Sequence, residues 1–95
     1  MYPVTIEWVP AKYGGRQQPP PVGLYYAVSR FDIVQNESWS VVFQLEINLI
    51  NSHQQWFTQG KVRFLFENAP TDYFDQSFSF KIYEGPHFVA NVFLR

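Results

Sequence analysis

The two histidines of this chain, His53 and His87, are the side chains best suited to metal binding or to acid–base catalysis near neutral pH. They fall in different predicted loops, and neither stands in a His-x-x-x-His or His-x-Glu spacing. Because the chain has no cysteine, a thiolate zinc site is excluded as well. We therefore predict no metal site and no cofactor.

Groups for nucleophilic or acid–base catalysis are present, but they do not form a catalytic motif. No serine stands in a Gly-x-Ser-x-Gly elbow. Asp72 and Asp75 have the chemistry for general acid–base catalysis, but in a loop with Pro70 and Tyr73 they are better explained as solvating a turn. We predict that the chain is not an enzyme. A small hydrolase, which needs a pocket holding a histidine beside an acid, is the remote alternative.

Two charged residues, Arg16 and Glu84, stand beside glycines in predicted turns. A guanidinium after Gly14-Gly15 would offer a planar fork to a phosphate or a carboxylate, and Glu84 before Gly85 would mark a polar contact. Each residue also has a structural explanation, because Arg16 would donate to loop carbonyls and Glu84 would accept backbone N–H groups. The sequence leaves both interpretations open.

Aromatic residues make up 20% of the chain, which is more than a small core needs. Those in or beside predicted loops are Tyr13, Tyr25, Tyr26, Trp56, Phe57, Tyr73, Phe74 and Phe88. Exposed Tyr and Trp are favoured anchors at protein interfaces, and they also stack on single-stranded bases. The net charge of −1 provides no field that attracts nucleic acid, which favours the protein interface. Capping of the fold by these rings is the structural alternative.

Alternation of apolar and polar residues with a period of two dominates the chain and predicts β-strands. It is clearest over residues 39–49, where one face is expected to be buried, and it recurs over 4–8, 62–66 and 78–82. Residues 24–33 should hold another strand, and residues 77–94 a hairpin that turns at Gly85-Pro86. Residues 51–60 show no period, so we expect a loop there that carries Trp56 and Phe57 as an alternative binding surface. No segment has a convincing helical stripe.

Six or seven short strands with regularly spaced turns predict an all-β fold, a small antiparallel β-barrel that residues 1–95 form as one domain. Closure would remove exposed strand edges, and the many Phe side chains are large enough to fill a small barrel. The lack of cysteine favours a reducing, cytoplasmic setting. The N-terminus lacks the features of a secretory signal, and no stretch approaches the ~20 apolar residues of a membrane helix. We expect a soluble protein with no membrane contact.

Two segments near the ends of the chain carry distinctive motifs. Residues 4–9 lead into Tyr13-Gly14-Gly15-Arg16, a proline-containing loop and Gly23-Leu24-Tyr25. Residues 80–90 read Phe-Lys-Ile-Tyr-Glu-Gly-Pro-His-Phe-Val-Ala. The order and spacing resemble the C-terminal β-barrel domain of translation elongation factor Tu, which has an acidic-Gly-Gly-Arg turn and a final Phe-x-Ile-Arg-Glu-Gly-Gly-Arg-Thr-Val-Gly hairpin. The resemblance implies a six-stranded antiparallel barrel without a GTPase domain.

In that family the two turns contribute to one face, which helps to hold aminoacyl-tRNA and also docks protein partners. The resemblance therefore implies a shared binding patch of Tyr13, Arg16, Tyr83, Glu84 and His87. Tyr83 and His87 stand where the family has arginines, so cations that would meet phosphates are lost. The sequence thus predicts a non-catalytic binding module whose partner is another protein, with RNA as the alternative, and it is compatible with a homo-oligomer.

Overall fold

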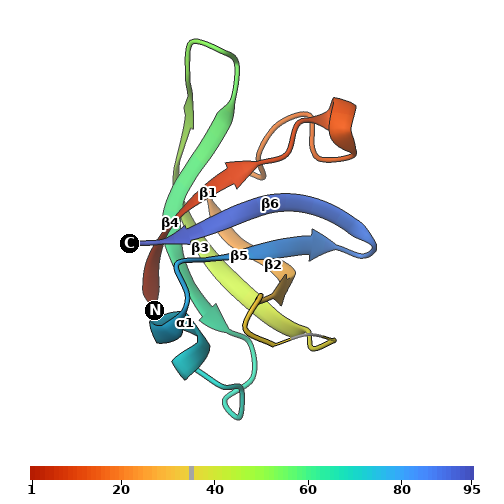
Figure 1. The fold of residues 1–95 in the computed structure, drawn as a ribbon. Helices are drawn as coiled ribbons and strands as arrows, with labels where there is room; N and C mark the ends of the chain where they lie inside the picture. Colours follow the sequence, from red (N-terminus) through yellow and green to blue (C-terminus); the bar gives the residue numbers. More distant parts are fainter. Residues whose placement is uncertain (35) are drawn as a thin grey trace.

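The computed structural model describes residues 1–34 and 36–95, and six antiparallel strands close into a barrel (Figure 1). The order around the barrel is β1-β4-β3-β2-β5-β6, and β6 pairs with β1 to complete the ring. The strands are β1 (Tyr2–Trp8), β2 (Gly23–Arg30), β3 (Trp39–Ile50), β4 (Trp56–Phe64), β5 (Ser79–Glu84) and β6 (His87–Leu94). The predicted small all-β barrel is confirmed, with six strands in the described residues.

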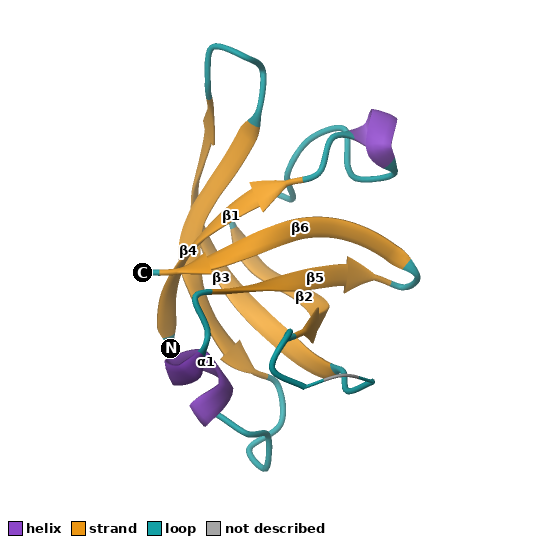
Figure 2. Ribbon diagram, viewed as in Figure 1, coloured by secondary structure: helices purple, strands orange, loops and turns teal. Residues whose placement is uncertain are grey.

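Helical structure in the described residues is limited to the 3-10 helix η1 (Ala11–Tyr13) and the α-helix α1 (Asp72–Gln76) (Figure 2). We expected Asp72 and Asp75 in a loop, and they lie in α1 instead. The short helix forms because it turns Phe74, which is only 3% exposed, into the core. Within residues 1–34 and 36–95, no helix has the length and the apolar character needed to cross a membrane.

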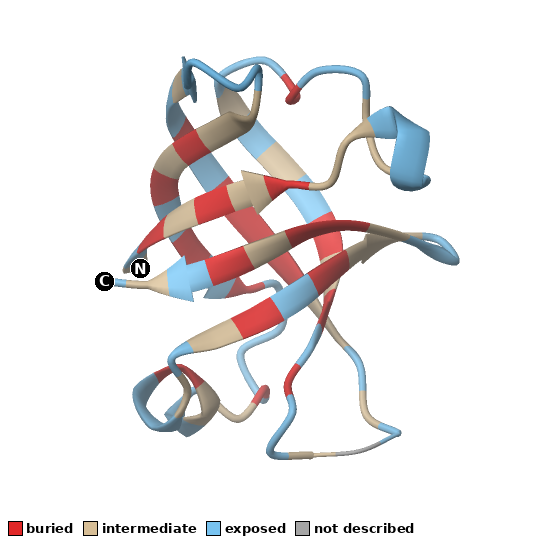
Figure 3. Ribbon diagram, turned by 45° about the horizontal axis from the view of Figure 1, so that its top comes forward, coloured by how far each residue is buried: buried red, intermediate tan, exposed pale blue. Residues whose placement is uncertain are grey.

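Buried and more exposed residues alternate along most of the strands, although consecutive buried residues occur in β3 and β6 (Figure 3). In β1, Val4, Ile6 and Trp8 are buried, whereas Thr5 and Glu7 between them are partly exposed. The buried residues of all six strands join in one hydrophobic cluster. Burying a large apolar side chain contributes roughly 1.5–3 kcal/mol relative to leaving it in water. The alternation in the sequence therefore determines which face of each strand lies inside.

The longest strand, β3, changes its inward face partway along. Phe43 and Leu45 are buried as expected, but the register with β4 shifts between Leu45 and Ile47. Such a β-bulge turns the following side chains to the other face of the strand. Ile47 and Leu49 are consequently 45% and 43% exposed. The expectation of one buried face along the whole strand was wrong beyond Leu45.

Strand β4 occupies part of the segment for which we expected a loop. Its residues from Phe57 to Gly60 pair with both β3 and β1, and Trp56 pairs with Ile50 of β3. Thr58 and Gly60 are the buried residues here, and neither gives an apolar signal in the sequence. A Cβ at Gly60 would lie 2.4 Å from the carbonyl oxygen of Gln44, so the barrel wall requires glycine. The loop prediction for 51–60 was therefore wrong in its second half.

Two aromatic residues expected on buried strand faces lie outside the strands. The strand predicted over 62–66 ends at Phe64, and Phe66 is 56% exposed. Phe78 precedes β5 and is 94% exposed. In both cases the alternation in the sequence extends beyond the point where strand pairing stops, so no neighbouring strand covers the ring.

One end of the barrel, which we call the closed end, is sealed by aromatic rings. Phe74 of α1 stacks on Phe64 at a centroid distance of 4.4 Å and packs against Tyr2 at 4.7 Å. Phe31 stacks on Phe80 at 4.5 Å beside them. Rings from the ends of several strands thus meet under α1 and fill this end of the core.

Candidate functional site

The residues predicted to bind a partner gather at the opposite end of the barrel, which we call the open end. Here β1, β3 and β5 end, and β2, β4 and β6 begin. Three connections meet: residues 9–22, the hairpin loop of residues 51–55, and the Gly85-Pro86 turn. The β3–β4 hairpin projects farther from the barrel than its neighbours (Figure 1). The open end is therefore built from turns and one projecting arm.

Two glycines position Arg16 at the open end, for different reasons. Gly14 ends η1 with a φ of 90°, a left-handed conformation that favours glycine. At Gly15 a Cβ would lie 1.9 Å from the carbonyl oxygen of Val9, so only glycine lets the chain fold back. The amide of Arg16 then donates to that same oxygen at 3.1 Å. The backbone of Arg16 is thus fixed against the end of β1.

Arg16, Glu84 and Tyr25 form a hydrogen-bonded cluster, which we call the clasp. Arg16 Nη1 donates to Glu84 Oε2 at 2.7 Å, and the Tyr25 hydroxyl donates to the same oxygen. Arg16 Nε donates to the carbonyl oxygen of Gln18 at 3.1 Å. Burial, followed by the hydrogen bond to Glu84, raises the pKa of Tyr25 far above its ordinary value. Tyr25 therefore stays a hydrogen-bond donor throughout the neutral pH range.

The clasp bridges a seam between β2 and β5. These strands pair only at Val28 with Tyr83, Ser29 with Ile82 and Arg30 with Lys81. Glu84 and Tyr25 lie beyond that short ladder, toward the open end. Side chains therefore close the barrel where backbone pairing stops. The structure brings Arg16 and Glu84 together. Arg16 donates to a loop carbonyl, as its structural explanation requires, whereas Glu84 accepts from two side chains rather than from the expected backbone N–H groups.

The other three residues of the predicted patch do not join the clasp. Tyr83 faces outward, and the Arg30 guanidinium lies 4.9 Å from the centroid of its ring. Tyr13 is 71% exposed. His87 is an exposed turn residue that pairs with Glu84 across the hairpin. None of these three side chains forms a hydrogen bond with the clasp in the described residues, and their role in binding stays a prediction.

The two histidines occupy different turns of the open end. His53 is exposed in the β3–β4 loop, and His87 begins β6. In the part of the chain that the structure describes, no three His, Asp or Glu side chains are placed to hold a metal ion. The hydrolase alternative needs a histidine beside an acid in a pocket, and the pocket of the open end, described next, has no histidine in its lining.

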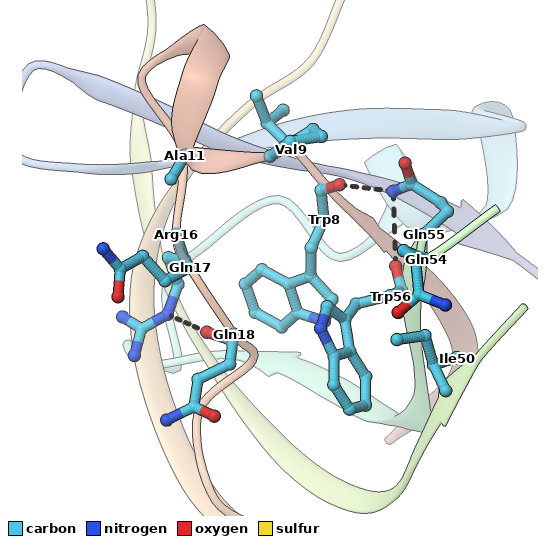
Figure 4. A pocket seen from close by; sticks show the side chains of 11 residues that line it. Trp8, Val9, Ala11, Arg16, Gln17, Gln18, Ile50, Gln54, Gln55 and Trp56 are labelled. Atoms are coloured by element: carbon cyan, nitrogen blue, oxygen red, sulfur yellow. Dashed lines mark hydrogen bonds between the residues drawn. The ribbon is translucent and has the colours of Figure 1, made fainter.

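A pocket of about 350 Å³ lies between the Arg16 turn and the β3–β4 hairpin (Figure 4). Two indole rings, one guanidinium and four carboxamides contribute to its lining. They belong to Trp8 and Trp56, to Arg16, and to Gln17, Gln18, Gln54 and Gln55. We call this site the tryptophan pocket. It unites Arg16 and Trp56, which the sequence assigned to two alternative surfaces.

Hydrogen bonds hold one wall of the tryptophan pocket in place. Gln55 Nε2 donates to the carbonyl oxygens of Trp8 at 2.6 Å and Trp56 at 3.4 Å. Trp8 Nε1 donates to the hydroxyl of buried Thr58 at 2.7 Å, and that hydroxyl donates to Asn48 Oδ1 at 2.6 Å. The ring of Trp8 therefore has a fixed orientation beneath the more exposed Trp56.

Sequence analysis assigned Trp8 to a buried face and gave the glutamines no role. Two Gln-Gln pairs, at residues 17–18 and 54–55, were the available signal. Carboxamide side chains are common on protein surfaces, so the pairs alone predict no site. Only the closed barrel places the two pairs on one pocket.

The outer side of the β3–β4 hairpin carries apolar side chains. Leu49 stands directly opposite Phe57, and Ile47 lies two residues before Leu49 on the same outward side. We call these three residues the hairpin face. Trp56 lines the tryptophan pocket, so the two aromatics of the predicted alternative surface lie on opposite faces of β4. The bulge in β3, which the sequence did not reveal, creates the hairpin face.

Comparisons with protein-family models, with curated proteins and with solved structures give no match to this chain. The functional interpretation therefore depends on the geometry of the clasp, the tryptophan pocket and the hairpin face.

Proposed function

We propose that this chain is a non-catalytic binding module that binds another protein through the hairpin face, formed by Ile47, Leu49 and Phe57. The observation that supports this proposal is the exposure of Ile47 and Leu49, at 45% and 43%, beside the partly buried Phe57 on an arm that projects from the barrel. Apolar side chains that cluster on a surface mark association sites more often than single exposed ones do. The lack of cysteine favours a reducing compartment, such as the cytoplasm, as the setting.

Polar residues surround the hairpin face as they do at protein interfaces. Gln59 stands opposite Ile47, and Glu7 stands opposite Phe57. An apolar centre within a polar rim is the common composition of an interface between proteins. The ring of Phe57 would provide buried area, and the charge of Glu7 would help to orient the partner.

RNA binding, the alternative that the resemblance to the elongation-factor barrel implies, has less support. The guanidinium of Arg16 is already bonded to Glu84, so a phosphate would have to compete with a carboxylate. Tyr83 and His87 replace the family's arginines at the second turn. Contacts between cations and phosphates dominate affinity for nucleic acid, and these two turns provide few cationic side chains for such contacts.

The test begins with capture of the partner by the tagged chain from its native cells, followed by titration of the purified pair. Leu49→Glu should weaken the complex at least about tenfold, because a charge would enter the apolar centre of the interface. Its melting temperature should stay close to that of the wild type, since Leu49 is 43% exposed. Raising the salt concentration should change the affinity little.

Phe78→Ser provides the matched control, because Phe78 is an exposed aromatic outside the strands and away from the hairpin. The control should keep full affinity. A complex that survives Leu49→Glu, that is lost in Phe78→Ser, or that dissociates steeply with salt would contradict the proposal. In the last case RNA becomes the leading candidate.

A further inference from the structure

We propose that the tryptophan pocket binds an uncharged sugar ring, a pyranose such as a neutral hexose or an N-acetylhexosamine. The pocket lies on the side of the β3–β4 hairpin opposite the hairpin face. The inference is therefore independent of the proposed protein interface. At about 350 Å³ the pocket is near the lower limit for ligand sites, roughly 300–1,000 Å³, which suits a ligand of ring size.

The charges around the pocket favour a neutral ligand. Arg16 is the one charged residue in the lining, and Glu84 compensates it at 2.7 Å. No carboxylate lines the pocket, so a cationic ligand would find no partner there. An anionic ligand would have to disrupt the clasp that closes the β2–β5 seam. An uncharged ligand avoids both costs.

Four backbone carbonyl oxygens of the lining are already bonded within the chain. The carbonyl oxygen of Val9 accepts from the Arg16 amide, and that of Gln18 accepts from the Arg16 side chain. The carbonyl oxygens of Trp8 and Trp56 accept from Gln55. An extended peptide would need free main-chain partners of this kind. With these four acceptors occupied, the side-chain carboxamides are the polar groups that we assign to ligand binding.

Carboxamides beside indole rings match the two kinds of surface on a pyranose. Each carboxamide offers both donors and an acceptor, which can meet neighbouring hydroxyl groups of a sugar. The C–H face of the ring is apolar and packs against an indole. Trp56 is partly exposed within the lining, and Gln17 and Gln54 are exposed near its rim (Figure 4). The pocket thus offers an apolar wall and a polar edge.

Gln54 lies in the tight turn of the β3–β4 loop, where its backbone amide donates to the carbonyl oxygen of Asn51 at 3.1 Å. Gln54 has a φ of 63°, in the left-handed region where glycine is favoured. A side chain in that conformation carries a backbone strain that glycine would avoid. Residues held in such conformations cluster at ligand sites. The strain at Gln54 is explained if its carboxamide is needed at the rim of the pocket.

The experiment is a titration of the purified full chain with methyl pyranosides of neutral hexoses and N-acetylhexosamines, followed by tryptophan fluorescence and calorimetry. We expect saturable binding of at least one of them that does not depend on salt concentration. Trp56→Ala should weaken it at least about tenfold. Gln54→Gly should weaken it about two- to tenfold through the lost hydrogen bond and should not lower the melting temperature.

Phe78→Ala is the control for Trp56→Ala, because Phe78 is an aromatic residue that is 94% exposed and lies outside the strands and outside the lining of the pocket. It should bind the sugar as the wild type does. The proposal is overturned if no pyranoside binds, or if binding survives both Trp56→Ala and Gln54→Gly. Preferential binding of a proline-containing peptide or of a charged sugar acid would also overturn it.

Discussion

The two ends of the barrel use aromatic residues in opposite ways. At the closed end the rings of Phe31, Phe64, Phe74 and Phe80 stack on one another, and all four side chains are 4% exposed or less. At the open end Trp8 and Trp56 line a pocket together with carboxamides and a guanidinium. At the closed end the aromatic rings pack against one another, whereas at the open end polar and apolar groups line a cavity.

Several departures from regular barrel structure lie at or near the open end, although Asn36 in the β2–β3 connection of the closed end also has a left-handed φ of 62°. The β2–β5 ladder stops short of the open end, the bulge in β3 lies on the way to it, and Gln54 adopts a left-handed conformation there. In natural proteins such local exceptions occur preferentially at functional sites. This difference between the ends agrees with our proposal that the binding surfaces lie at the open end and that the aromatic rings of the closed end stabilise the fold.

The largest effect is expected from Phe74→Ala at the closed end. Phe74 is 3% exposed and stacks on Phe64 at 4.4 Å, so its removal leaves a cavity that short α1 cannot fill. The free energy of unfolding should fall by about 3–5 kcal/mol, as measured by urea denaturation. Phe78→Ala, at 94% exposure, should change it by less than about 0.5 kcal/mol. Equal losses in the two variants would contradict the division between the ends.

A smaller loss is expected when the clasp is broken. Glu84→Ala removes the acceptor of both Arg16 and Tyr25 at the seam between β2 and β5. The ion pair is about one-third exposed, at 32% and 34%, so solvent weakens it. The free energy of unfolding should fall by about 1–2 kcal/mol. Arg16→Ala should lose less, because Tyr25 keeps its bond to Glu84.

A double-mutant cycle of Arg16→Ala with Glu84→Ala separates the ion pair from the other contacts of each residue. The coupling energy should be about 0.5–1 kcal/mol. A coupling of zero, together with unchanged stability in both single variants, would show that the clasp does not hold the seam. Arg16 would then be available as a binding residue, as the sequence predicted.

The contribution of Tyr25 to stability should be comparable in size to that of the Arg16–Glu84 ion pair, but it should depend on pH. The pKa of Tyr25 is raised by burial and by Glu84, so the folded chain keeps this proton at pH values where the unfolded chain releases it. Stability is therefore present below the unfolded pKa of about 10 and declines as the pH rises above it, by up to about 1.4 kcal/mol per pH unit. Tyr25→Phe, followed by thermal unfolding from pH 8 to 11, should show a shallower decline. Parallel pH profiles would exclude this explanation.

The sequence predicted some strands of the barrel better than others, depending on which residue types occupy the inward positions. Where inward positions hold large apolar side chains, as at Val4, Ile6 and Trp8, alternation revealed the strand. Where the inward positions hold Thr58 and Gly60, alternation did not reveal the strand. Burial at these two positions depends on a hydrogen bond and on close backbone approach rather than on hydrophobicity. Local pattern therefore predicts the apolar wall of the barrel and misses its polar part.

The candidate site was predictable only in part, for a similar reason. Arg16 and Glu84 were selected as turn residues, and the fold does join them. The tryptophan pocket and the hairpin face depend on contacts between segments about 40 residues apart and on a one-residue bulge in β3. No local sequence pattern indicates these long-range contacts or the bulge, so the two surfaces could be recognised only in the folded structure.

The smallest effect is expected from the carboxamides of the open end. Gln17 forms no side-chain hydrogen bond with the described residues, and it is exposed at the rim of the tryptophan pocket. Gln17→Ala should therefore change the free energy of unfolding by less than about 0.5 kcal/mol, as measured by urea denaturation. Gln55→Ala is the matched comparison, because Gln55 bridges the carbonyl oxygens of Trp8 and Trp56. It should cost about 1–2 kcal/mol, since both buried acceptors lose their donor. A stability loss in Gln17→Ala as large as that in Gln55→Ala would mean that the rim of the tryptophan pocket supports the fold. That result would contradict the proposed division between a stabilising end and a binding end.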